Sequence, residues 1–427
     1  MVEYHIEGGF PIKGTITPGG NKNAALPCIA ASLLTGQPVT LRNIPAIHDT
    51  HVMLDIAKAC GARVKKLDNN SWEITAETIT STEIPKDLSK KIRASILFAG
   101  SLVARSGKLT MYPPGGDVIG KRRLDTHFLA LTELGVRVCA DGCFTFSTNK
   151  LVGADMFLDE ASVTGTENAL MAAVLAEGQT IITNAASEPH VQDLCTMLNL
   201  MGANITGIGS NILTIDGVET LHGCDFTIGP DFMEIGSFIG LAAATKGSIT
   251  IEGVNPRDLR PIKLAFGKLG IHWEINGTTL HVSENQSMQV NTDLGGMIPK
   301  IDDSPWPGFP PDLTSIMTVV ATQVEGTVLI HEKMFESRMF FVDKLIGMGA
   351  RITLCDPHRA VVTGPCTLHA DDELTSPDVR AGMAIVIGAL CAKGKSVIRN
   401  VYQVERGYEH LAERLKSLGA RIERVEA

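Results

Sequence analysis

The chain has 427 residues, of which 44% are hydrophobic and 20% are charged. This balance is typical of a globular protein with enough apolar side chains for two domains or one large composite. The formal net charge of −9 argues against broad binding to nucleic acid or acidic membranes, since such surfaces attract basic proteins.

A small-residue helix, a glycine and a short β-like run follow one another six times along the chain. Glycine just after a helix is typical of a left-handed C-cap, so each copy predicts a helix that stops before a strand. A second phrase follows each copy, as in CGARV at 60–64 and LGARI at 418–422. The spacing is about 70 residues, longer than in common solenoid repeats. The glycines of the first phrase are Gly36, Gly107, Gly178, Gly247, Gly326 and Gly394.

Each copy therefore predicts a helix, a strand, a polar loop, a second helix and another strand. In the sixth copy Leu411, Leu415 and Leu418 lie at i, i+4 and i+7, which predicts an amphipathic second helix. The predicted fold class is α/β, with six units in two sets of three. The first strand, residues 4–10, precedes the first unit and can pair with either half. Function is expected in the loops that differ between copies.

Clustered cations and glycines mark several of these loops. Residues 19–23 read GGNKN, and residues 90–93 read KKIR. Residues 112–125 read YPPGGDVIGKRRLD, whose glycines let backbone N–H groups approach a ligand and whose arginines suit a phosphate or carboxylate. The alternative is a surface loop with solvated charges. Later cations lie in comparable loops, and together they predict a cleft for a small anion: Arg338, Arg380 and Arg406.

Asp312 follows two prolines in GFPPD, just before a predicted helix. Its ordinary role would be that of an N-cap or near-cap carboxylate, and its functional role that of a fixed general base. No P-loop, HExxH motif or dinucleotide fingerprint after a strand is present, so ATP, zinc and NAD chemistry are unsupported.

Other features favour a soluble, cytoplasmic protein. The nine cysteines are an odd number without metal-ligand spacing, as expected for reduced thiols. The first residues, MVEYHIEGGF, lack the pattern of a secretory signal. The longest apolar run, residues 383–392, is about half the roughly 20 residues that a membrane span requires.

Eight segments, read in order, carry a resemblance to a known family. They are GGNKNAALP at 19–27, IRASILFAG at 92–100, PPGGDVIGKRRLDTH at 113–127, NAASEPHVQD at 184–193, GFPPDLTS at 308–315, FESR at 335–338, DVRAG at 378–382 and ERGYEHL at 405–411. The chain resembles, over nearly its whole length, the UDP-N-acetylglucosamine enolpyruvyl transferases, relatives of the shikimate-pathway enolpyruvyl transferases.

The resemblance implies a two-domain inside-out α/β barrel of six βαβαββ repeats, three in each domain. It implies one domain of residues 22–229 and another of residues 1–21 with 230–427, with the active site in the cleft between them. It also implies the reaction. The enolpyruvyl group of phosphoenolpyruvate passes to the 3-hydroxyl of UDP-N-acetylglucosamine and phosphate leaves, with no metal or organic cofactor. This is the first committed step of peptidoglycan synthesis.

The resemblance further implies residue roles. Lys22, Arg122 and Arg406 hold the phosphate end of phosphoenolpyruvate, and Arg338 and Arg380 bind near its carboxylate. Asn23 and Asp312 position the sugar hydroxyl, and Arg93 contacts the nucleotide sugar. The expected uridine diphosphate site is lined by Arg122, Arg123, Leu124, Asp125, Thr126, Ser162, Val163, Thr164 and Met334.

Some positions depart from the family pattern. Asp117 stands where most members have Cys, and we expect its carboxyl group to serve as the proton donor. Further departures, at His48, Arg123, Glu160 and His190, concern the acceptor half and leave open a nucleotide acceptor such as UMP. A non-catalytic sensor of the nucleotide sugar is the alternative from another class, against which the presence of Lys22, Asp312 and Arg406 argues.

The Asp117 substitution predicts resistance to fosfomycin, because a carboxyl group is not alkylated by this epoxide as a thiol is. Purified protein incubated with fosfomycin should keep its activity over time. Time-dependent loss of activity at low micromolar fosfomycin would contradict the prediction.

Overall fold

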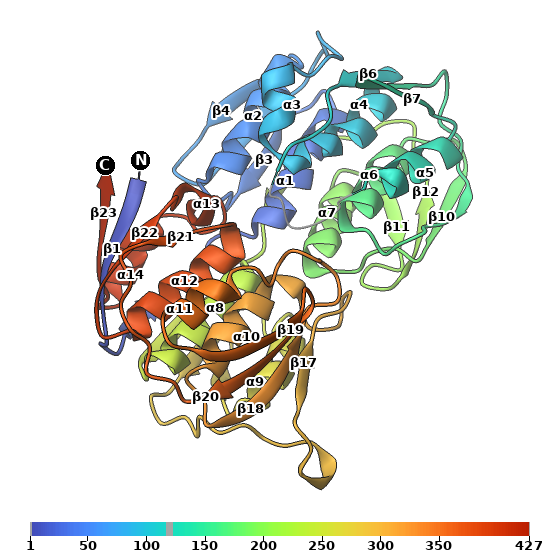
Figure 1. Cartoon of the computed structure of the whole chain (residues 1–427). Coiled ribbons are helices and arrows are strands. Elements are labelled where there is room, and N and C mark those ends of the chain that lie inside the picture. The colour runs from blue at the N-terminus through green and yellow to red at the C-terminus, as the bar shows by residue number, and fades with distance from the viewer. Residues whose placement is uncertain (1, 117–122, 427) are drawn as a thin grey trace. The chain divides into compact units, whose positions relative to one another are not determined.

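The computed structural model describes residues 2–116 and 123–426. It divides into two units, each with its own hydrophobic core (Figure 1). The first unit holds residues 20–116 and 123–229, and the second unit holds residues 2–19 and 230–426. Asp117 and Arg122, two of the predicted site residues, lie outside the described residues.

One stretch of the first unit shows the repeat in full. Its elements are β9 (Asp155–Phe157), α6 (Val163–Ala173), β10 (Gln179–Thr183), α7 (Pro189–Leu200), β11 (Asn204–Thr206) and β12 (Ile212–Asp216). The sheet order is β11-β12-β10-β9, with β9 parallel to β10 and the other pairs antiparallel. This βαβαββ order is the repeat that the resemblance implies.

The rest of the first unit contains two related copies. The helices are α1 (Lys22–Ala31), α2 (His48–Ala59), α3 (Lys86–Lys91), α4 (Phe98–Ser106) and α5 (Asp125–Glu133), with 3₁₀ turns η1 (Ser32–Leu34) and η2 (Arg93–Leu97). The strands are β3 (Val39–Arg42), β4 (Arg63–Lys66), β5 (Trp72–Thr75), β6 (Lys108–Met111), β7 (Arg137–Asp141), β8 (Cys143–Ser147) and β13 (Asp225–Thr227). Within the described residues the sheet β6-β8-β7 has three strands, and the edge position holds a single parallel bridge between Glu83 and Thr110.

The second unit contains three further copies. Its helices are α8 (Phe232–Ala244), α9 (Arg260–Gly267), α10 (Thr314–Ala321), α11 (Val342–Gly347), α12 (Val379–Cys391), α13 (Tyr402–Glu405) and α14 (Leu411–Ser417), with η3 (Leu294–Gly296) and η4 (Pro311–Leu313). Its strands are β1 (Val2–Gly8), β2 (Lys13–Ile16), β14 (Ser248–Glu252), β15 (Glu274–Asn276), β16 (Thr279–Val282), β17 (Lys300–Asp302), β18 (Gly326–His331), β19 (Arg351–Asp356), β20 (Arg359–Gly364), β21 (Leu374–Thr375), β22 (Gly394–Arg399) and β23 (Arg421–Glu426).

The edge strands explain why the second unit is built from two separate stretches of chain, residues 2–19 and 230–426. β2 precedes α1 in the sequence but pairs in parallel with β14, and β13 precedes α8 but pairs in parallel with β3. The first strand of the chain, β1, pairs antiparallel with both β22 and β23. Since the sequence left its partner open, this pairing assigns the first strand to the last repeat.

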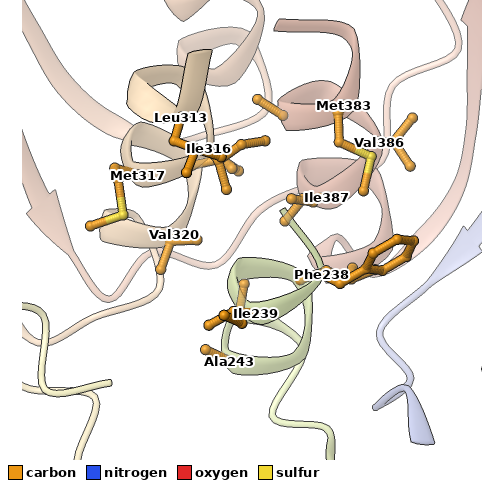
Figure 2. Close-up of a cluster of buried hydrophobic side chains, with 14 of the residues drawn as sticks. Phe238, Ile239, Ala243, Leu313, Ile316, Met317, Val320, Met383, Val386 and Ile387 are labelled. Carbon is orange, nitrogen blue, oxygen red and sulfur yellow. The ribbon is translucent and has the colours of Figure 1, made fainter. Parts of the chain in front are cut away.

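The first helix of each copy is buried. In the second unit, η4 and the buried helices α8, α10 and α12 bring Phe238, Leu313, Ile316 and Ile387 into one cluster (Figure 2). A Cβ at Gly240 would lie 2.7 Å from Cγ2 of Ile316, so glycine is needed for α8 to approach α10 this closely. Helices α1, α4 and α6 are likewise buried in the first unit.

Several expectations of the sequence are met. The α/β fold class is confirmed, and Leu411, Leu415 and Leu418 are buried as the amphipathic pattern predicted. Four of the six glycines in the first phrase have positive φ, but Gly36 and Gly247 do not. A Cβ at Gly247 would lie 2.1 Å from the carbonyl oxygen of Ile12, so a close approach explains that glycine instead.

Across residues 2–116 and 123–426, every helix is too short or too polar to cross a membrane.

Candidate functional site

Lys22 is the first residue of the buried helix α1 in the first unit. Its Nζ lies 2.6 Å from Oδ2 of Asp49 in α2, and the two side chains are only 13% and 5% exposed. A cation at a helix N-terminus is unfavourable because the helix dipole is positive there, so the buried carboxylate of Asp49 compensates for it. Asn21 caps the helix by accepting a hydrogen bond from the backbone N–H of Asn23 (2.9 Å). The start of α1 therefore presents amide and ammonium groups suited to an anion.

Arg93, at the start of η2, contacts the glycine-rich loop at two places. Its guanidinium group donates a hydrogen bond to the carbonyl of Arg123 (2.9 Å). Its Cβ lies 2.9 Å from where a Cβ on Gly116 would be, and a Cβ on Gly115 would lie 1.8 Å from the carbonyl oxygen of Lys90. These two glycines are therefore required by close packing against residues 90–93. This is a different reason from the ligand approach that the sequence predicted.

Arg123 forms a two-pronged pair with Asp125, the first residue of α5. Its Nε and Nη2 lie 2.6 and 2.8 Å from the two carboxylate oxygens. The hydrogen bonds from Arg123 lower the pKa of Asp125, so this carboxylate is charged at neutral pH. The positive charge that Arg123 was expected to bring to the nucleotide is thus shared with a neighbouring acid.

The N-terminal ends of α5 and α6 lie together, as expected for residues lining one site. Thr126 donates to Asp159 (2.7 Å), and Ser162 caps α6 by accepting from the backbone N–H of Gly165 (3.2 Å). The hydroxyl of Thr164 lies 3.0 Å from Nε2 of His127, which is buried between the two helices. Leu124 and Val163 flank these caps at the helix starts.

His127 had no role in the sequence prediction, and its hydrogen bonds define its tautomer. The side-chain amide of Asn168 donates to Nδ1 of His127 (2.7 Å), while its oxygen accepts from the backbone N–H of Gly100 (2.8 Å). Burial, with a further contribution from Arg93, lowers the pKa of His127 to about 3. The ring is therefore neutral, carries its proton on Nε2 and donates to Thr164. The hydroxyl proton of Thr164 remains available to another acceptor.

In the second unit, two arginines converge on one carboxylate. Arg338 Nη2 lies 2.7 Å from Oδ1 of Asp312, and Arg380 Nε lies 3.0 Å from Oδ2. The three side chains are 14%, 6% and 21% exposed for Arg338, Arg380 and Asp312. Burial raises the pKa of Asp312, but the two guanidinium charges outweigh it and hold that pKa well below its usual range. Asp312 is therefore a charged, fully engaged carboxylate.

Asp312 stands near the start of α10, but its side chain does not cap the helix. The residue lies in η4, and α10 begins at Thr314 without a side-chain cap. The carboxylate instead faces arginines that are 26 and 68 residues away in the sequence. The cap of α12 is Asp378, which accepts from the backbone N–H groups of Arg380 and Ala381 (2.8 and 2.9 Å).

The remaining predicted residues of the second unit are Arg406 and Met334. Arg406 ends α13 and donates to Gln403 (3.1 Å). A Cβ on the next residue, Gly407, would lie 3.8 Å from Nη1 of Arg380, so the backbone just after Arg406 passes close to that guanidinium group. Met334 is 38% exposed, and its backbone N–H donates to Asp303 (3.2 Å).

Two residues of the first unit that contact predicted site residues there had no signal in the sequence. Asp49 and His127 act through partners that are distant in the chain or on another helix, and neither lies in a recognisable motif with its partner. A buried acid next to a loop cation, or a buried His beside Asn, is identified only when the helices are packed.

Comparison with known proteins agrees with the architecture. Residues 6–415 match the family model of EPSP synthase (3-phosphoshikimate 1-carboxyvinyltransferase). Because this match covers most of the 427 residues, the chain belongs to the EPSP synthase family. The fold is shared with the enolpyruvyl transferase NikO from Streptomyces tendae (TM-score 0.87, 24% identity, 100% and 99% of the two chains). It is also shared with EPSP synthase from Acinetobacter baumannii (TM-score 0.76, 18% identity, 100% of both chains).

Curated relatives are similar over nearly their whole length. The chain is 69% identical over 423 residues to the UDP-N-acetylglucosamine 1-carboxyvinyltransferase of Treponema denticola, covering 99% of each chain. It is 65% identical to the protein of the same name from Treponema pallidum, covering 98% of each. The protein of that name from Borreliella burgdorferi is 57% identical over all of both chains.

The neutral His127 predicts acid sensitivity of the fold. Its pKa is about 3 in the folded protein and 6.5 when unperturbed, so the unfolded state binds the proton first as pH falls below 6.5. The free energy of unfolding should then fall by about 1.4 kcal/mol per pH unit from this residue alone. Urea denaturation between pH 7 and 4.5 should show a shallower acid slope for His127→Gln than for the wild type. The exposed His222→Gln serves as the control and should keep the wild-type slope, and an unchanged slope in His127→Gln would contradict the assignment.

Proposed function

We propose that this protein transfers the enolpyruvyl group of phosphoenolpyruvate to the 3-hydroxyl of UDP-N-acetylglucosamine and releases phosphate, the first committed step of peptidoglycan synthesis. The observation that carries the proposal is the convergence of Arg338 and Arg380 on Asp312, since paired guanidinium groups match a carboxylate substrate. The names of relatives at 57–69% identity supply the acceptor. A cytoplasmic location is part of the same proposal.

The roles follow from the chemistry of each side chain. Phosphoenolpyruvate carries a carboxylate and a phosphate, so separate cations are needed for its two ends. The nucleotide half needs hydroxyl, amide and arginine donors for the diphosphate and uracil. We assign the carboxylate to Arg338 and Arg380; the phosphate to Lys22, Arg122 and Arg406; the sugar hydroxyl to Asn23 and Asp312; the nucleotide to Arg93, Arg122, Arg123, Leu124, Asp125, Thr126, Ser162, Val163, Thr164 and Met334; and the proton donor to Asp117.

The reaction requires one proton at C3 and the removal of another from the sugar hydroxyl. Protonation of C3 makes C2 of phosphoenolpyruvate oxocarbenium-like, and the sugar oxygen then forms a bond to C2. The resulting tetrahedral ketal loses phosphate by cleavage of the C–O bond at C2, and a proton leaves C3 to restore the double bond. Asp117 is proposed for the C3 proton and Asp312 for the hydroxyl proton.

Asp312 needs a change of partners before it can act as a base. While both guanidinium groups neutralise it, its pKa is too low for it to accept a proton readily. The carboxylate of phosphoenolpyruvate is a second ligand for the same two guanidinium groups. When that carboxylate binds them, Asp312 loses hydrogen bonds and its pKa rises toward the usual range, so substrate binding itself strengthens the base.

The arginine assignment is tested by Arg338→Lys and Arg380→Lys. Lysine keeps the charge but loses the planar fork, so the KM for phosphoenolpyruvate should rise by roughly tenfold or more. The KM for UDP-N-acetylglucosamine should stay within about twofold. The matched control is Arg359→Lys. Arg359, the first residue of β20, forms an exposed ion pair with Asp356 at the end of β19, so this change should alter neither KM value. An equal rise of both KM values in Arg338→Lys would contradict the assignment.

The acceptor is tested by measuring phosphate release from phosphoenolpyruvate with UDP-N-acetylglucosamine and, in parallel, with UMP. We expect turnover with the nucleotide sugar and little with UMP. Turnover with UMP alone would replace the proposed acceptor by a nucleotide, and binding of the sugar nucleotide without any turnover would indicate a sensor. Lys22→Ala and Asp312→Ala should each abolish the turnover that the wild type shows.

A further inference from the structure

Glu332, the residue after β18, is completely buried beneath the arginine pair. Its main chain is fixed on both sides: its N–H donates to the carbonyl of His358, and its own carbonyl accepts from Nδ1 of His358 (both 2.8 Å). An acidic residue held inside a protein in this way requires an explanation, since unpaired charges are costly to bury.

The side chain of Glu332 borders a small cavity of about 10 Å³, whose other walls include Thr314, Ser315, Arg338 and Arg380. Among the described residues, no hydrogen bond of ordinary geometry reaches either carboxyl oxygen of Glu332, the hydroxyls of Thr314 and Ser315, or Nε of Arg338. Asp303 and Thr314 nevertheless lie close enough to the carboxyl group of Glu332 to shift its pKa. Buried polar atoms are almost always hydrogen-bonded. Several such atoms surround this one cavity, next to the two arginines that we assign to the substrate carboxylate. The hydrogen bonds of this polar site therefore depend on which groups the arginines bind.

Several charged groups lie near Glu332. Asp303, held in place by the backbone N–H groups of Lys333 and Met334, repels a second negative charge. Arg338 attracts it, but this guanidinium group is already paired with Asp312, and Asp378 lies at the same cavity. Burial is the main cause that raises the pKa of Glu332, to about 9. The negative charge of Asp303 also raises this pKa, and the positive charge of Arg338 lowers it by less than burial raises it. At neutral pH the side chain is an uncharged carboxylic acid.

The charge state of Glu332 matters to the proposed substrate. Arg338 and Arg380 both pair with Asp312, and the buried Asp231 lies 3.9 Å from Arg380. An ionised Glu332 would add a further negative charge beside the two arginines and weaken their attraction for an anion. A neutral acid adds no such charge. It also offers an O–H donor and a carbonyl acceptor to the arginine atoms and hydroxyls around the cavity.

We propose that Glu332 is a positioning residue for phosphoenolpyruvate binding, whose buried carboxyl group supports the Arg338–Arg380 pair from the cavity behind it. The inference rests on the proposed function, because it takes the carboxylate of phosphoenolpyruvate as the ligand of that pair. Glu332 does not itself touch the substrate. Its proposed role is to keep the two guanidinium groups in place for the substrate once Asp312 has been released from them.

The test compares Glu332→Gln with Glu332→Ala in steady-state phosphate release by the full chain. Gln has the size and hydrogen-bonding capacity of the neutral acid, so the KM for phosphoenolpyruvate should stay within about twofold of wild type. Ala removes the support, so that KM should rise roughly tenfold while the KM for UDP-N-acetylglucosamine is unchanged. The matched control is Glu325→Ala, an exposed acid one residue before β18, which should change neither constant.

Thermal unfolding gives a second measurement that does not depend on activity. At pH values above the ordinary pKa of 4.5, a buried acid that stays neutral lowers the free energy of unfolding, because ionisation of this acid stabilises the unfolded chain. Glu332→Gln should therefore have a higher Tm than wild type at pH 8, and the difference should narrow as pH falls toward 4.5. A lower Tm for Glu332→Gln at pH 8, or a rise in its KM for phosphoenolpyruvate as large as that of Glu332→Ala, would overturn the proposal.

The two hypotheses fail in distinguishable ways. If Arg338→Lys leaves the KM for phosphoenolpyruvate unchanged, the assignment of the carboxylate site is wrong. If Arg338→Lys raises that KM but Glu332→Ala does not, only the role of Glu332 is wrong. Should Glu332→Ala fail to fold, the Tm and KM of Glu332→Gln still decide the question.

Discussion

Two guanidinium groups buried in the second unit must be compensated where they lie, and Asp312 pairs with both while Asp231 lies 3.9 Å from Arg380. Removing one partner from such a network costs about 3–5 kcal/mol, because the remaining charge is left buried without compensation. The elements around the network are arranged to meet this requirement. η4 carries the carboxylate at the start of α10, α12 carries Arg380 in its first turn, and the loop after β18 carries Arg338. The same constraint makes Asp312 a weak base until an anion replaces it.

The repeated scaffold allows this arrangement because its buried helices approach each other closely. Gly236 and Gly240 in α8 face Leu313 and Ile316, where any side chain would collide. Close packing of this kind fixes where the helices begin, and the functional side chains lie at those beginnings. Lys22, Ser162 and Arg380 all occupy the first turn or cap of a buried helix. The closely packed interior therefore positions the functional side chains where the variable loops meet the buried helices.

Uncharged titratable groups are a second recurring feature. His127 is neutral because it is buried and accepts a hydrogen bond at Nδ1, and Glu332 is neutral because it is buried beside another acid. Each lies directly behind a residue that we assign to ligand binding: Thr164 in the first unit and Arg338 in the second. In both places a buried group that carries no charge lies next to a side chain that we assign to ligand binding.

The sequence by itself determined the repeat, the α/β class and the identity of most candidate cations. Periodic apolar residues and glycines after helices are local signals, and charged loop residues can be read without knowing their neighbours. It did not determine why Gly115 and Gly116 are glycines, what Asp312 faces, or that β1 completes the last sheet. Asp49, His127 and Glu332 were also beyond its reach. Their properties depend on partners brought close by helix packing, and on burial, which changes the charge state of an acid or a histidine. Only the tertiary structure decides those distances and that exclusion of water, because no local pattern in the chain records them.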